Sequence, residues 1–132
     1  MKKITLLLSL FCVALGQAQT PTAGPATPPT RNAVDVISIY GAAYTNITGV
    51  NTNPNWGQTT AVTEVQLDGN DVLQYANFNY QGTDFSGNAQ NIATMEFLHV
   101  DVWTNSQSPN VFAISSGAEI AHSIPSLAGS WQ

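Results

Sequence analysis

The stretch AVTEVQLDGNDVLQYANFNY, residues 61–80, decides the fold class of this chain. Apolar or β-branched side chains alternate with polar ones over 61–67, and a period of two returns over 72–80 with Val, Tyr and Phe. Such alternation, with β-branched and aromatic residues, is typical of strands. The four residues between the two runs, Asp-Gly-Asn-Asp at 68–71, favour a tight turn. The sequence therefore predicts an antiparallel β-hairpin.

Four further runs outside this hairpin have the same period of two. Clusters of Asn, Gly, Asp, Ser and Pro separate them, as is typical of turns. No stretch of ten or more residues keeps the period of 3.6 that predicts a helix. We therefore expect an all-β fold, an antiparallel β-sandwich of the jelly-roll type. The further strands are predicted over residues 34–40, 95–104, 110–116 and 118–124.

The predicted strand over 95–104 has two different faces. One face places His99, Asp101 and Trp103 in line, which is an unusual set for a plain solvent face. The other face is aliphatic, and we expect it to pack in the core. It consists of Leu98, Val100 and Val102.

Aromatic rings beside amides and carboxylates suit a neutral ligand that is rich in hydroxyl groups. The C–H face of a sugar packs on a ring, while Asn, Gln and Asp side chains hydrogen-bond its hydroxyls. We therefore predict a ligand-binding face made by Trp103, Asp101 and His99, with Trp56 and Tyr75 as aromatic platforms from elsewhere in the fold. The alternative stays open that these aromatic side chains form the core and the amides the surface.

The amino-terminal part predicts export and then a spacer. Residues 1–18 combine Lys2 and Lys3, an apolar run of about a dozen residues and a small-residue end at Ala18. That run is shorter than the roughly 20 residues of a membrane span, so we expect a cleaved signal peptide and a secreted protein. Residues 19–30 contain four prolines and almost no large apolar side chain, which predicts an extended Pro/Thr-rich spacer. The sandwich domain is then expected over 31–132.

The charge balance excludes several function classes. Beyond residue 18, Arg31 is the single strong cation against eight acidic residues, a formal charge of −7 with His neutral. Binding of nucleic acid or of anionic membrane surfaces needs many Lys and Arg, so neither partner is expected. The only cysteine, Cys12, lies in the predicted signal, which leaves no disulfide, thiolate metal site or Cys nucleophile in the mature chain.

No motif for catalysis is present in the sequence. A G-x-S-x-G elbow, a P-loop, G-x-G-x-x-G and H-E-x-x-H are all absent. The turn at 68–71 superficially resembles a calcium loop, but the spacing fails at Val72 and no Glu closes it. Glu96 and Asp101 are five residues apart on one strand and so point to opposite faces, unlike the facing carboxylates of a glycosidase. We therefore expect no enzyme activity from this chain.

Three stretches carry a resemblance to a known family: DVISIYGAAYTN at 35–46, NPNWGQ at 53–58 and FLHVDVWT at 97–104. In this order they resemble a β-sandwich accessory domain of secreted bacterial polysaccharide-degrading proteins, including laminarinase-type and agarase-type glycoside hydrolases. The likeness covers roughly residues 28–132. It implies a galactose-binding-like jelly roll that acts as a carbohydrate-binding module, holding a neutral polysaccharide of β-glucan or galactan type near a covalently linked hydrolase domain.

Two departures from the family pattern affect what the resemblance implies. The family has Ser-Asp or Ser-Asn where this chain has Gly41 and Ala42, so a metal or sugar contact made there is in doubt. Family members also continue past Trp131 into one or two further strands, so we expect this sequence to be truncated or a fragment. Structural calcium is common in such sandwiches, and its site would be incomplete here.

Two other function classes remain open. The chain could be a structural or adhesive surface domain without glycan binding, or the amino-terminal part of a multidomain glycoside hydrolase. The mature chain's lack of lysine and its aromatic and amide side chains favour the glycan-binding module.

Overall fold

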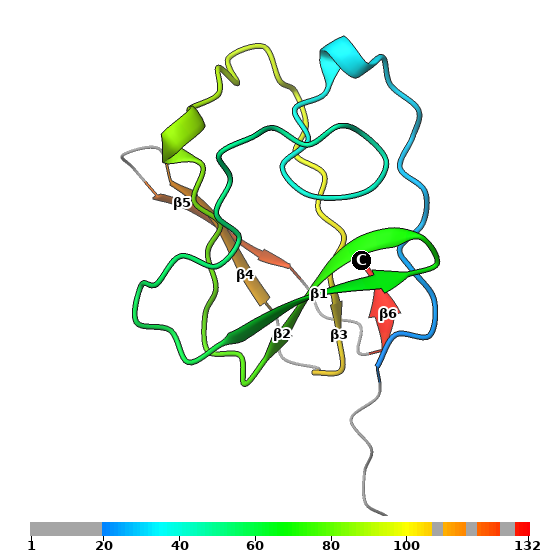
Figure 1. Cartoon of the computed structure of the whole chain (residues 1–132), viewed down its shortest axis with the longest axis vertical. Helices are drawn as coiled ribbons and strands as arrows, with labels where there is room; N and C mark the ends of the chain where they lie inside the picture. Colours follow the sequence, from blue (N-terminus) through cyan, green and yellow to red (C-terminus); the bar gives the residue numbers. More distant parts are fainter. Residues whose placement is uncertain (1–19, 107–109, 116–118, 125–128) are drawn as a thin grey trace, which may run out of the picture.

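The computed structural model describes residues 20–106, 110–115, 119–124 and 129–132 of the chain. In this part, the only regular elements are short strands and two 3-10 helices, which confirms the all-β class. The strands pair into three two-stranded antiparallel sheets, β1–β2, β3–β6 and β4–β5 (Figure 1). In chain order the elements are η1 (Ala33–Asp35), β1 (Ala61–Leu67), β2 (Asn70–Ala76), η2 (Ser86–Asn88), β3 (Trp103–Thr104), β4 (Asn110–Ser115), β5 (Glu119–Ile124) and β6 (Ser130–Trp131).

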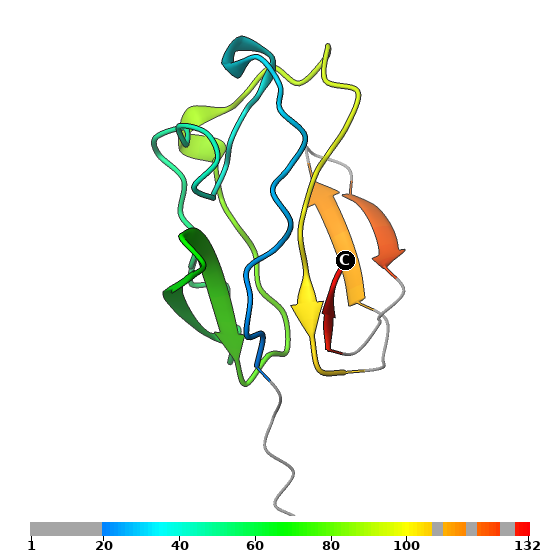
Figure 2. The same ribbon diagram turned by 90° about the vertical axis from the view of Figure 1, so that its right-hand side faces the viewer.

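The sheets lie in two groups. Figure 2 shows the β1–β2 hairpin on one side and β3, β4, β5 and β6 on the other. The amino-terminal segment, residues 20–30, runs upward between the two groups and contacts both of them. Long loops complete the hairpin side, so the jelly-roll topology stays a prediction.

The hairpin predicted around residues 68–71 is confirmed. Leu67 pairs with Asn70, which leaves Asp68 and Gly69 as a two-residue turn. Their φ angles are 49° and 78°, in the left-handed region that Asp tolerates and Gly adopts freely. The second strand runs over Asn70–Ala76, whereas 72–80 was predicted. It ends after Ala76 because Asn77 also has a positive φ, of 51°.

The long strand predicted over 95–104 is wrong for most of its length. Only Trp103–Thr104 forms a strand, extended by reciprocal backbone hydrogen bonds of 3.0 Å between Val102 and Gln132. The predicted core face is wrong as well, because the Leu98 side chain is 58% exposed and Val100 is also exposed. Alternation tells which side chains share a face, but it does not tell whether another strand pairs with the segment or covers that face.

The strand predicted over 34–40 is also wrong. Its first residues form η1, and only Ser38 makes a β-bridge, with Asn46. The Asn46 side chain explains this local structure: Ser38 Oγ donates to its Oδ1 at 2.7 Å, and its Nδ2 donates to the Gly41 carbonyl at 3.0 Å. A short amide side chain that binds nearby backbone competes with a regular ladder.

The two strands predicted in the last third of the chain are confirmed as β4 and β5. They pair in register from Asn110 with Ile124 to Ser115 with Glu119. The predicted strand ends at 116 and 118, and the export signal predicted over 1–18, lie outside the described residues.

Hydrogen bonding, more than apolar burial, holds the described loops together. Among the residues whose burial is described, no large apolar side chain is buried, whereas Thr60 is only 7% exposed. Thr60 Oγ1 lies 2.7 Å from the Tyr80 carbonyl and accepts from the Asn79 amide at 3.2 Å. This hydroxyl therefore joins the start of β1 to the loop that follows β2.

Candidate ligand-binding site

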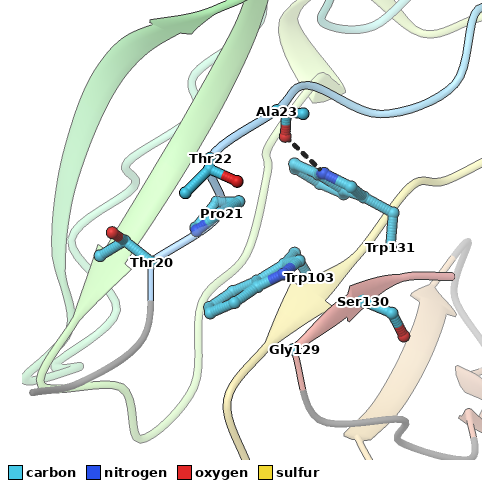
Figure 3. Close-up of a pocket in the computed structure, with 8 residues that line it drawn as sticks. All are labelled: Thr20, Pro21, Thr22, Ala23, Trp103, Gly129, Ser130 and Trp131. Carbon is cyan, nitrogen blue, oxygen red and sulfur yellow. Dashed lines mark hydrogen bonds between the residues drawn. The ribbon is translucent and has the colours of Figure 1, made fainter.

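Two tryptophans form the centre of the candidate site. Trp103 of β3 and Trp131 of β6 are direct register partners in an antiparallel pair, so their side chains leave the sheet on the same face. Both are half-buried and line a pocket of about 160 Å³. Figure 3 shows both indole rings directed toward the amino-terminal segment that crosses this face. The remaining lining residues are Thr20, Pro21, Thr22, Ala23, Gly129 and Ser130.

The lining of this pocket is aromatic and hydroxylic. Besides the two indoles it is lined by Thr20 and Thr22, and none of the described residues that line it is ionisable. Rings offer apolar faces, and hydroxyls both donate and accept hydrogen bonds. The pocket chemistry therefore suits a neutral ligand with both C–H and O–H groups.

The amino-terminal segment is bound at this site by its backbone. Trp131 Nε1 donates a hydrogen bond of 2.8 Å to the Ala23 carbonyl (Figure 3). The next amide, that of Gly24, donates to Asp68 Oδ2 in the hairpin turn at 3.0 Å. Two consecutive residues thus join β6 to the β1–β2 hairpin.

His99 and Asp101 contact each other, as expected for residues two apart on an extended segment. His99 Nε2 lies 3.0 Å from Asp101 Oδ2, with the imidazole exposed and the carboxylate half-buried. Neither residue lines the Trp103 pocket among the residues described. An exposed pair of this kind contributes little to stability.

Trp56 is a separate aromatic platform. Its side chain is 55% exposed, and its backbone is fixed by two side chains: Gln58 Oε1 accepts from its amide at 2.8 Å, and the Tyr80 hydroxyl donates to its carbonyl at 2.6 Å. The six-membered ring contacts Gly82, where an added Cβ would lie 2.0 Å from Trp56 Cζ3. Trp56 is therefore held in place although it is exposed.

Tyr75 belongs to another aromatic contact, on β2. Its ring stacks on Phe78, with centroids 6.1 Å apart and planes inclined by 11°. Burial raises the pKa of the Tyr75 phenol, and a hydrogen bond to Thr83 opposes that shift. The structure thus brings Trp103 together with Trp131, and it groups neither Trp56 nor Tyr75 with that pair among the contacts described.

Sequence reasoning missed Trp131, the register partner of Trp103. Its strand has only two residues, too few for an alternation to be recognised. The available signal was a single Trp directly after Gly129 and Ser130. Glycine at 129 has a φ of 79°, which turns the chain into β6.

The described residues define an all-β protein with a pocket that is lined by two tryptophans and by uncharged residues. In this part of the chain, no group of three or more His, Cys, Asp and Glu could hold a metal ion, and no helix is long and apolar enough to span a membrane. Searches against protein-family models, curated proteins and solved structures find no match to this chain.

Proposed function

We propose that this chain is a secreted, non-catalytic carbohydrate-binding module that holds a neutral polysaccharide. The observation that supports this most is the pairing of Trp103 with Trp131 on one face of the β3–β6 pair. Two adjacent indoles supply the apolar faces on which the C–H groups of sugar rings pack.

The size and charge of the site narrow the ligand class. With residues 20–23 in place, its volume of about 160 Å³ is below the roughly 300–1,000 Å³ of pockets for drug-sized ligands, so beside this segment it suits one sugar ring better than a whole oligosaccharide. Arg31 is the only cation beyond the predicted signal, so an anionic polysaccharide would find little countercharge. A β-glucan or a galactan is the proposed class, within a sandwich of jelly-roll type.

Affinity electrophoresis tests this function. The full chain is run in gels that contain laminarin or agarose, beside Trp103→Ala, Trp131→Ala and Trp56→Ala variants whose folding is checked by circular dichroism. We expect retention of the natural chain in at least one gel, and loss of retention for the first two variants. Unchanged mobility of the natural chain across a broad glycan panel would refute glycan binding.

A structural or adhesive role is the second candidate. It is favoured by the exposed apolar residues ahead of β3, where the Phe97 side chain is 82% exposed. Large exposed apolar side chains that lie close together are typical of protein contacts. In that case the chain would associate with other protein and would not be retained by any glycan gel.

A further inference from the structure

The chain's own segment Thr20-Pro21-Thr22-Ala23 forms one wall of the pocket of Trp103 and Trp131, and it bends at Thr22 and Ala23. Aromatic-lined grooves recognise proline-containing peptides through ring contacts, and an indole N–H can add a hydrogen bond to a peptide carbonyl. Both elements are present here, because Pro21 lines the pocket and Trp131 Nε1 donates to the Ala23 carbonyl.

The stretch that follows this segment, residues 24–31, is anchored at both of its ends. Beside Ala23, the Gly24 amide donates to Asp68 Oδ2 at 3.0 Å. At the far end, the Arg31 amide donates to the Tyr44 hydroxyl at 2.9 Å, and that hydroxyl donates to the Pro29 carbonyl at 3.4 Å. This stretch therefore follows a fixed path away from the pocket, although its composition is that of a spacer.

Gly24 is the position at which the path depends on glycine. A Cβ placed there would lie 2.7 Å from the Leu67 carbonyl oxygen and 2.7 Å from Asn70 Nδ2. The first of these atoms is backbone of the hairpin and cannot rotate away. A side chain at 24 would consequently move the segment off the hairpin and draw Ala23 away from Trp131.

We infer that residues 20–23 compete with a glycan for the tryptophan pair, and that a sugar chain binds across Trp103 and Trp131 only when this segment leaves. The inference rests on the proposed function for its glycan part and on the contacts above for its peptide part. A site that is open only part of the time binds its ligand more weakly in proportion to the open fraction. The resident segment therefore lowers the apparent affinity for glycan.

The test compares Gly24→Ala with Gly87→Ala in the full chain. At Gly87 the nearest atom to an added Cβ is the Gly49 carbonyl oxygen at 3.8 Å, so this control is free of a clash. In ¹⁵N-labelled protein, the Trp131 indole N–H, assigned with Trp131→Phe, is followed by hydrogen exchange. Glycan affinity is measured on the same samples by affinity electrophoresis in laminarin and in agarose.

We expect the Trp131 indole to be protected in the natural chain and in Gly87→Ala, and to exchange faster in Gly24→Ala. Glycan affinity should rise at least about fivefold in Gly24→Ala, since two hydrogen bonds no longer hold the segment over the site. Asp68→Gly keeps a turn that accepts positive φ while removing the acceptor for Gly24, so it should act in the same direction if Gly24→Ala folds poorly.

Three results would overturn the account, each at a different point. An indole that exchanges equally fast in the natural chain and in Gly24→Ala would show that the segment is not held against Trp131. A released indole with unchanged glycan affinity would refute the competition and leave the proposed function standing. Absence of glycan binding from every variant, released or not, would refute the proposed function together with the competition.

Discussion

Trp103 and Trp131 lie directly opposite each other across the β3–β6 pair, and the indole nitrogen of Trp131 is 2.8 Å from the Ala23 carbonyl oxygen. Trp131 is 28 positions from Trp103 and more than 100 from Ala23 in the sequence, yet the three residues meet at one small site. The site combines an aromatic pair with the backbone of the amino-terminal segment. Under the proposed function, its stability and its ligand binding are therefore linked.

The Trp131 hydrogen bond should be measurable as stability. Trp131→Phe keeps an aromatic ring but removes the donor to Ala23, so we expect a loss of about 1 kcal/mol in the free energy of unfolding beyond the effect of the smaller ring. Trp103→Phe is the matched control, since it makes the same change of ring and leaves the bond to Ala23. Urea unfolding followed by circular dichroism gives both values. Equal losses for the two variants would contradict a role for this bond.

Thr60 should be the most sensitive hydroxyl in the described loops. Thr60→Val leaves the Tyr80 carbonyl and the Asn79 amide without this partner in a buried place, which we expect to cost about 1–3 kcal/mol. Thr60→Ser keeps the hydroxyl and should retain most of that stability. Urea unfolding of the two variants checks this. If Thr60→Ser were as unstable as Thr60→Val, packing of the methyl group would be the cause.

The hairpins were predictable from the sequence, whereas the loop before β3 was not. The β1–β2 hairpin was predictable because Asp68 and Gly69 carry their own turn signal, and β4 and β5 because their alternation is long. The segment before β3 alternates equally well, yet it lacks a ladder in the structure, since pairing depends on a partner that local sequence does not specify. For the same reason Trp103 was identified while its partner Trp131 was not.

The exposed position of Trp56 should depend on Gly82. Gly82→Ala places a Cβ against the indole, so we expect the ring to move and its fluorescence emission to change. A Trp103→Phe/Trp131→Phe background isolates the Trp56 signal, because the chain has three tryptophans. Gly87→Ala in that background is the control and should leave the emission unchanged. An unaltered spectrum in Gly82→Ala would show that the ring does not rest on Gly82.

Acid should weaken the loop around Asp84. The Ser86 backbone amide, which donates to Asp84 Oδ1 at 2.8 Å, and the Ser86 hydroxyl lower the pKa of this carboxyl below its ordinary value of 3.8. Because the folded pKa is depressed, the stabilisation is present above the ordinary value and is lost as pH falls through the folded pKa. We therefore expect the natural chain to exceed Asp84→Asn in urea midpoint at pH 6, and the difference to vanish in strong acid. A difference that is constant with pH would contradict this assignment.

The most direct measurement of the central claim is a titration of the ¹⁵N-labelled full chain with soluble laminarin and agarose oligosaccharides, followed at the three indole N–H signals. Single Trp→Phe variants assign the signals of Trp56, Trp103 and Trp131. The account predicts that the Trp103 and Trp131 signals shift and saturate with one of the two sugars while that of Trp56 shifts less. Saturable shifts confined to Trp56, or no shift at all with either sugar, would contradict it.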